Sequence, residues 1–167
     1  FSSSLIRTKD ADNADYSTVF FINLLFSLVL YILLFSLAPF VAQFYEQAVL
    51  TDLLRVLGLI LIFNAFSIVQ STKLNKSLNF KMQFKLQLPA LFISAAVSIW
   101  MAISGYGVWS LVAKDLILAF VANILLWTYS RWQPSFIFDK QKLKTHFNFG
   151  YKLSLTQIIN TSFDNLY

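Results

Sequence analysis

Residues 16–45 read YSTVFFINLLFSLVLYILLFSLAPFVAQFY and contain no charged side chain. A helix needs ~20 mostly apolar residues to cross the ~30 Å hydrocarbon core of a bilayer, and this run exceeds that length. We therefore predict a first membrane-spanning helix at about residues 20–42. Pro39 falls near its far end, where the loss of one backbone hydrogen bond does least damage.

A second apolar run predicts a spanning helix at about residues 53–72. This run is more polar than the first, and its polar residues are Asn64, Ser67, Gln70 and Ser71. Such side chains usually face neighbouring helices or a wet cavity rather than lipid. The second helix is therefore expected to have an inner face.

A third, longer apolar run covers residues 86–113 and contains the sequence Gly105-Tyr106-Gly107. Two glycines around one residue predict a tight turn. One continuous helix would be far too long for the hydrocarbon core. We therefore expect a helical hairpin with spans at about residues 88–104 and 108–129.

The composition agrees with a membrane protein and excludes several kinds of site. Of the 167 residues, 57% are hydrophobic and 13% are charged, whereas soluble domains carry about 25% charged residues. The mean hydropathy is +0.64. With no cysteine and only His146, a disulfide framework, a cysteine-based metal site and most histidine chemistry are excluded. We expect no catalytic machinery, cofactor or metal, and so no enzyme.

The character of the sequence changes after Ser130. RWQPSFIF contains Pro134 and is typical of an extended linker, and the lysine-rich DKQKLKTHFNFGYKLSL is amphipathic and suited to the membrane surface. We therefore divide the chain into four spans within residues 1–133, a linker with an amphipathic helix at 134–152, and the start of a fifth span at 153–167. The chain is expected to be a piece of a longer protein.

Most basic residues fall in three segments, which lie before the first span, between the second and third, and after the fourth. They are Arg7, Lys9, Lys73, Lys76, Lys81, Lys85, Arg131, Lys140, Lys142, Lys144 and Lys152. Four alternating spans place all three segments on one side, and the positive-inside rule makes that side cytoplasmic. The N-terminus is then cytoplasmic. The net charge of +5 reflects anchors near anionic headgroups and not a nucleic-acid-binding face.

Residues at the predicted span ends have structural interpretations. Asp15 or Asn13 is expected to cap the first helix. The aromatic residues near span ends suit interfacial belts, although Trp100 is also open to interpretation as a core residue. The belt residues are Trp100, Trp109, Trp127, Trp132, Tyr45, Tyr106 and Tyr129.

Lys114 and Asp115 interrupt an apolar span and are the first candidates for a functional role. From a helix start near Gly107, Lys114 lies ~10 Å inside at 1.5 Å per residue. Charges inside a membrane mark pathways, so both could line a cavity. Alternatively, Lys114 extends to the interface and Asp115 caps or pairs with a neighbour. Adjacent residues on a helix do not face each other, so a pair between these two is not assumed.

A second candidate is a polar stripe on the predicted fifth span. Gln157, Asn160 and Asp164 recur at i, i+3 and i+7, which puts them on one helix face. Inside a membrane this face would meet a hydrated cavity or a partner helix. If the segment lies at the membrane interface, these side chains simply face water.

Five stretches, in order, resemble the Wzx-like polysaccharide-exporting flippases of bacteria, in the multidrug/oligosaccharidyl-lipid/polysaccharide superfamily. These are LIRTKDADNADYSTVFFINLL, LAPFVAQFYEQAVLTDLLRVLGL, KLNKSLNFK, GYGVWSLVAKDL and LLWTYSRWQPSFIFDKQKLKTHFNFGYKL. The resemblance implies an all-α membrane fold of two six-helix lobes around a central cavity. The chain would cover helices three to six and the start of helix seven. Residues 1–133 would then belong to the N-terminal lobe and 134–152 to the cytoplasmic connection between lobes.

The resemblance also implies a function. Such proteins move undecaprenyl-diphosphate-linked oligosaccharide across the bacterial inner membrane by alternating access, for O-antigen, lipopolysaccharide, capsule or exopolysaccharide. Expected partners are the lipid-linked oligosaccharide, membrane lipids and other polysaccharide-assembly proteins, and not nucleic acid. A cation facing the cavity would suit the diphosphate, with Lys114 first and Arg55 second. The alternatives are a multidrug or small-solute antiporter of the same superfamily, and a membrane-embedded polysaccharide polymerase or ligase.

Overall fold

The computed structural model describes residues 12–130, 132–135 and 156. Within these residues it contains no strand and four helices. They are α2 (Asn13–Phe44), α3 (Val49–Lys76), α4 (Phe80–Ile103) and α5 (Trp109–Ser130). All four are long and apolar enough to cross a membrane, so the predicted all-α multi-pass membrane fold is confirmed. The predicted start of a fifth span, except Thr156, and residues 136–152 of the predicted linker lie outside the described residues.

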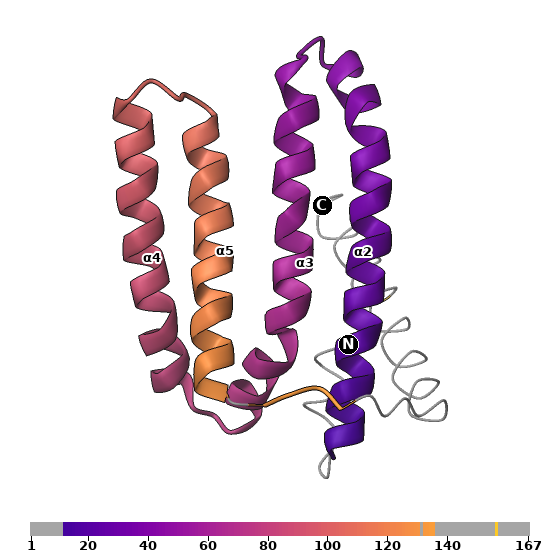
Figure 1. Cartoon of the computed structure of the whole chain (residues 1–167), viewed down its shortest axis with the longest axis vertical. Coiled ribbons are helices and arrows are strands. Elements are labelled where there is room, and N and C mark those ends of the chain that lie inside the picture. The colour runs from indigo at the N-terminus through magenta and orange to yellow at the C-terminus, as the bar shows by residue number, and fades with distance from the viewer. Residues whose placement is uncertain (1–11, 131, 136–155, 157–167) are drawn as a thin grey trace.

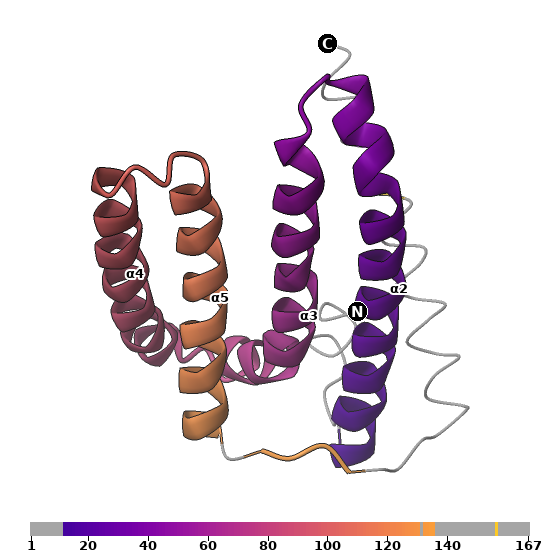
Figure 2. The same ribbon diagram turned by 45° about the horizontal axis from the view of Figure 1, so that its top comes forward.

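The helices form two antiparallel hairpins, α2–α3 and α4–α5 (Figures 1 and 2). Helix α5 packs against both α4 and α3, whereas α3 and α4 barely touch although they are consecutive in sequence. The order across the bundle is therefore α2, α3, α5, α4 (Figure 1). This order leaves room between α3 and α4 on one side of α5.

The two ends of the bundle differ in charge. One end holds the 45–48 and 104–108 connections, and we call it the turn end (Figure 1). The other holds the start of α2, the 77–79 connection and the 132–135 segment, and we call it the basic end. Lys73 and Lys76 lie in the last turn of α3, and Lys81 and Lys85 lie near the start of α4. The described lysines before and after the 77–79 connection therefore share one end, as the charge-based topology requires.

Helix α2 begins with a reciprocal cap. The Asp15 backbone N–H donates to Asp12 Oδ1 at 2.9 Å, and the Asp12 backbone N–H donates to Asp15 Oδ2 at 3.0 Å. This is a capping box, with the N-cap residue in an extended conformation. The expectation that Asp15 or Asn13 is the N-cap was wrong, because both already have helical backbone and Asp15 serves at the third helical position.

The three connections use left-handed backbone in different ways. Gly105 and Gly107 have φ of 85° and 52°, in the turn that separates α4 from α5. Glu46 and Leu78 adopt φ of 54° and 53° in the other two connections. Only glycine adopts this region without cost from its side chain. The α4–α5 turn therefore has residues suited to its backbone, and the other two connections carry strain.

Helices α2 and α3 approach closely at Gly58. A Cβ atom there would lie 2.8 Å from Tyr31 Cδ2 and 3.0 Å from Leu34 Cδ2. Small residues allow membrane helices to come together and gain dispersion contacts. The absence of a side chain at Gly58 is therefore required by the packing of the α2–α3 hairpin.

An aromatic cluster joins α2, α3, α5 and the chain after α5 toward the basic end. Its members are Tyr16, Phe20, Phe66, Trp127 and Trp132. The Phe20 ring meets Phe66, Trp127 and Trp132 edge to face, with centroids 5.7, 6.0 and 6.0 Å apart. Phe20 is 3% and Trp132 9% exposed, so Trp132 is a core residue rather than a member of an interfacial belt.

The 132–135 segment is fastened to α2 by hydrogen bonds. Trp132 Nε1 donates to Asn13 Oδ1 at 2.6 Å, Asn13 Nδ2 donates to Ser135 Oγ at 2.6 Å, and the Ser135 backbone N–H donates to Ser17 Oγ at 3.0 Å. Lys73 Nζ lies 4.8 Å from the Trp132 ring centroid, a favourable cation–π arrangement. The segment therefore links α5 to a helix that is not its neighbour in the row.

Candidate functional site

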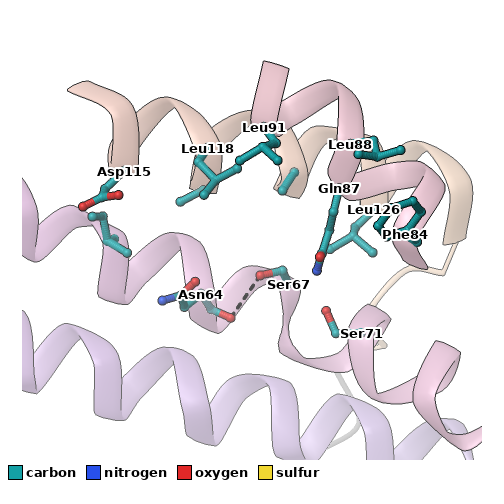
Figure 3. Close-up of a pocket in the computed structure, with 13 residues that line it drawn as sticks. Asn64, Ser67, Ser71, Phe84, Gln87, Leu88, Leu91, Asp115, Leu118 and Leu126 are labelled. Carbon is teal, nitrogen blue, oxygen red and sulfur yellow. Dashed lines mark hydrogen bonds between the residues drawn. The ribbon is translucent and has the colours of Figure 1, made fainter. Parts of the chain in front are cut away.

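A groove lies between α3, α4 and α5 (Figure 3). Its volume is about 600 Å³, within the ~300–1,000 Å³ of small-molecule sites. The groove exists because α5 contacts α3 and α4 while those two helices stand apart. It is therefore a consequence of the helix order and not of any one segment.

One face of each helix lines the groove. The lining residues are Ile60, Asn64, Ser67 and Ser71 of α3, Phe84, Gln87, Leu88 and Leu91 of α4, and Asp115, Leu118, Ala119, Ala122 and Leu126 of α5. On both α3 and α5 they recur every three or four residues, which keeps them on one face. From Ile60 to Ser71 the helix rises about 16 Å at 1.5 Å per residue. The groove thus runs along roughly half of a ~30 Å hydrocarbon core.

Several polar groups in the groove have no partner in the described part of the chain. Ser67 Oγ donates within α3, to Phe63 O at 3.1 Å and Asn64 O at 3.3 Å. The side chains of Asn64, Ser71 and Gln87 form no hydrogen bond to any described residue, and Gln87 points toward Ser67 and Ser71 (Figure 3). An amide without a hydrogen bond is costly in hydrocarbon. The groove therefore requires water or another polar occupant.

The charged residues of α5 form a pair beside the groove. Lys114 Nζ lies 3.5 Å from Asp115 Oδ1, and the two side chains are 45% and 50% exposed. Only Asp115 lines the groove. The structure therefore brings together two neighbours for which pairing was not assumed, and presents the carboxylate to the groove. An exposed pair of this kind stabilises a protein by only ~0–1 kcal/mol.

The remaining predicted site residues lie elsewhere. Arg55 does not line the groove and packs on α2, with its guanidinium carbon 4.2 Å from the Phe35 ring centroid. Its Nε is buried without a hydrogen bond within the described part of the chain. Gln157, Asn160 and Asp164 lie outside the described residues. Of the six predicted residues, Asp115 alone is a described lining residue of this groove.

Sequence reasoning singled out part of the α3 face but did not name it as a site. Asn64, Ser67 and Ser71 were expected to face a helix or a wet cavity, and all three line the groove. Gln87 was missed, although it is the one amide between Leu86 and Leu88 in an apolar run. A single amide within an apolar run was the signal that could have indicated a polar site on α4.

The opposite side of the α3–α5 contact is chemically different. A second hollow of about 420 Å³ is lined by Phe63, Phe66, Phe120, Asn123, Ile124, Trp127 and Thr128. There the Asn123 side-chain amide donates to the Phe63 carbonyl, and Trp127 Nε1 donates to the Phe66 carbonyl at 3.0 Å. Those donors join α5 to α3 and leave a mainly aromatic surface. The unpaired polar groups therefore face only the first groove of these two.

The groove offers hydrogen bonds and apolar contacts rather than reactive groups. Within the described residues, no group of three or more His, Cys, Asp or Glu side chains is placed to hold a metal ion. The lining amides, hydroxyls and single carboxylate, together with Leu and Ala side chains, can bind a polar molecule. The described side chains of the groove are therefore suited to binding a polar molecule.

Comparison with known proteins gives the family. The polysaccharide biosynthesis protein family matches residues 1–167. Teichuronic acid biosynthesis protein TuaB of Bacillus subtilis (strain 168) is 28% identical over 96% of this chain and 34% of its own length. Succinoglycan biosynthesis transport protein ExoT of Rhizobium meliloti (strain 1021) is 24% identical over 95% of this chain and 32% of its own.

This chain therefore spans about a third of the length of these two relatives. No solved structure matches it. The family match nevertheless extends over every residue of the chain and agrees with the resemblance read from the sequence. This chain, whose described residues form four helices able to span a membrane, belongs to the polysaccharide biosynthesis protein family.

Proposed function

We propose that this chain is part of a flippase that moves undecaprenyl-diphosphate-linked oligosaccharide across the bacterial inner membrane by alternating access. The observation that carries the proposal is a groove, within a bundle of membrane-spanning helices, in which the side chains of Asn64, Ser71 and Gln87 form no hydrogen bond to a described residue. The family, and relatives named for teichuronic acid biosynthesis and succinoglycan transport, support a role in polysaccharide export.

The physical task explains why such a groove is useful. Each sugar hydroxyl that enters hydrocarbon without a partner costs several kcal/mol, so an oligosaccharide cannot cross unaided. Asn64, Ser67, Ser71 and Gln87 offer hydrogen bonds that replace those of water, and the lipid tail stays in the bilayer. No bond needs to break, so the protein acts as a transporter and not as an enzyme.

The orientation of the bundle in the membrane follows from its charges. We place the basic end, with Lys73, Lys76, Lys81 and Lys85, in the cytoplasm by the positive-inside rule. The N-terminus of the chain is then cytoplasmic, residues 1–133 belong to the N-terminal lobe, and 134–152 connect it to a second lobe whose first helix begins at 153–167. Ser71 and Gln87 lie at the cytoplasmic part of the groove, and Asp115 lies toward the periplasm.

The predicted site residues have separate roles under this proposal. Lys114 holds Asp115 and does not itself contact the diphosphate. Arg55, Gln157, Asn160 and Asp164 remain candidates for parts of the transport cavity beyond the groove. The O-antigen, lipopolysaccharide, capsule and exopolysaccharide pathways, and contacts with other polysaccharide-assembly proteins, are all compatible with this assignment.

The proposal is tested with the full-length gene in its own organism. Deletion should stop glycan export and cause lipid-linked oligosaccharide to accumulate in the cytoplasmic leaflet. Complementation with the Asn64→Leu/Gln87→Leu double variant should restore about a tenth or less of export, because each lost hydrogen bond weakens transition-state binding by ~1 kcal/mol. The control is Phe92→Leu, on a side chain of α4 that is 70% exposed and outside the groove.

The antiporter alternative makes the opposite prediction. The Asp115 carboxylate in the groove is the feature that favours it, because a proton- or cation-coupled antiporter needs an acidic group. A deletion strain with normal glycan export and increased sensitivity to cationic drugs would refute the flippase proposal and support the antiporter.

A further inference from the structure

The polar groups of the groove are of a mixed kind. Asn64 and Gln87 each present an NH₂ donor and a carbonyl acceptor, and the Ser71 hydroxyl donates and accepts. The Ser67 hydroxyl donates within α3 and can still accept. A sugar hydroxyl has the same dual character, so it can pair with every one of them. A diphosphate only accepts, so it could use the donors of the groove but would leave the amide oxygens without a partner.

The charge of the groove also disfavours a diphosphate. Asp115 is the only charged residue among those that line it in the described part of the chain, and it is acidic. Its partner Lys114, 3.5 Å away, is not a lining residue. Side chains that hold phosphate groups are most often Arg or Lys, and metal cations also bind them. A diphosphate in this groove would meet a carboxylate instead of a cation.

The shape of the groove suits a chain of sugars. It is about 600 Å³ in volume, and it extends about 16 Å along α3 at 1.5 Å per residue. Its α5 side is kept open by the small Ala119 and Ala122, between Leu118 and Leu126. Apolar walls with a few placed polar groups are typical of sites that bind small polar molecules.

We propose that this groove selects the uncharged, hydroxyl-bearing sugars of the lipid-linked substrate, and that the diphosphate is held elsewhere in the full-length protein. The inference rests on the proposed flippase function and adds which part of the substrate this site binds. It also changes the role expected for Lys114, from a ligand of the diphosphate to a positioning residue for Asp115.

Cysteine labelling gives the test, because the present chain contains no cysteine. The full-length protein, with any cysteines elsewhere replaced by serine, carries the single substitution Ser67→Cys and is reconstituted in lipid nanodiscs. The rate of labelling by a water-soluble maleimide is measured alone and with three probes. These are undecaprenyl diphosphate, the lipid-linked oligosaccharide that accumulates in the deletion strain, and the free oligosaccharide released from it.

We expect Ser67→Cys to react with the maleimide, because the groove is wet. The lipid-linked oligosaccharide, and the free oligosaccharide at higher concentration, should slow labelling about tenfold when each is present at ten times its Kd, by mass action. Undecaprenyl diphosphate should leave the rate unchanged. The matched control is Ser104→Cys, because Ser104 is an exposed serine at the turn end, in contact with water and outside the groove, and no probe should alter its labelling.

Two results would overturn the inference. An unreactive Ser67→Cys protein would mean that another part of the full-length protein fills the groove. Protection by undecaprenyl diphosphate as strong as that by the lipid-linked oligosaccharide would mean that the groove binds the diphosphate. Neither result affects the flippase proposal, which is judged by glycan export in the deletion strain.

Discussion

The α2–α3 and α4–α5 hairpins use their interiors differently. The first is closed by the approach at Gly58 and by the aromatic cluster around Phe20. The second has fewer fully buried residues, with Ala90 and Ser94 as those of α4, and its helices border the polar groove. One hairpin thus provides rigid packing, and the other forms most of a binding surface.

This difference suggests a division of labour. The tightly packed hairpin also holds the chain that follows α5, through the Trp132 and Ser135 contacts with α2. A binding site is more useful on a surface with open space than on one filled by side chains. Substitutions in the α2–α3 hairpin should therefore reduce stability, and substitutions in the groove should reduce transport with little effect on stability.

The largest effect is expected for Trp132→Ala. It removes a ring that is 9% exposed and the hydrogen bond to Asn13, so the free energy of unfolding should fall by ~3–5 kcal/mol. Thermal unfolding of the full-length protein in detergent measures the loss. Trp100→Ala is the matched control, because Trp100 is 64% exposed. Equal shifts of the two variants would contradict the central role of the aromatic cluster.

The next largest effect is expected at Gly58. A Gly58→Leu side chain would collide with Tyr31, since even a Cβ atom lies only 2.8 Å from Tyr31 Cδ2. Overpacking of this kind costs ~1–3 kcal/mol. The Gly58→Leu/Tyr31→Ala double variant should recover part of the loss, which a double-mutant cycle of unfolding measurements would show. Additive losses would mean that the two residues do not limit the α2–α3 distance.

The sequence predicted the helices themselves but not every contact between them. The four helices followed from long apolar runs, because the hydrocarbon core restricts the length and polarity of each segment independently. The burial of Trp132 could not be predicted, because it depends on contacts with Asn13 and Phe20, more than a hundred residues earlier.

The groove was only half predictable for the same reason. The spacing of Asn64 and Ser67 indicated an inner face on α3, since periodicity is a local property. The partners of that face depend on α5, and not α4, standing next to α3. Gln87 therefore could not be assigned to the same site from its position in the sequence.

The third prediction separates binding from packing. Ala122→Leu places a larger side chain in the groove, so glycan export in the complemented deletion strain should fall about tenfold, equivalent to ~1.4 kcal/mol. The midpoint of thermal unfolding should hardly change. Ala96→Leu, on an exposed position of α4, is the control. Normal export by the Ala122→Leu protein would exclude the groove from the transport path.

A smaller effect is expected for the charged pair. Lys114→Ala should lower export a few-fold without preventing membrane insertion, because it leaves the Asp115 carboxylate unpaired beside the groove. The free energy of unfolding should change by less than ~1 kcal/mol, as for other exposed pairs. Adding Asp115→Asn should restore export if Lys114 acts through Asp115. Failure of this second substitution to restore export, with the Asp115→Asn single variant active, would indicate a direct role for Lys114.

The smallest effects compare the two turns at the turn end. Glu46 in the α2–α3 turn has φ of 54°, and Gly107 in the α4–α5 turn has φ of 52°. A side chain in left-handed backbone costs ~1–2 kcal/mol, part of which is offset because glycine has more freedom in the unfolded chain. Glu46→Gly should therefore raise the free energy of unfolding by up to ~1 kcal/mol, and Gly107→Ala should lower it by a similar amount. Since a Cβ atom at Gly107 would meet nothing within 4 Å, thermal unfolding shifts of opposite sign would come from the backbone alone, and shifts of the same sign would contradict this account of the turns.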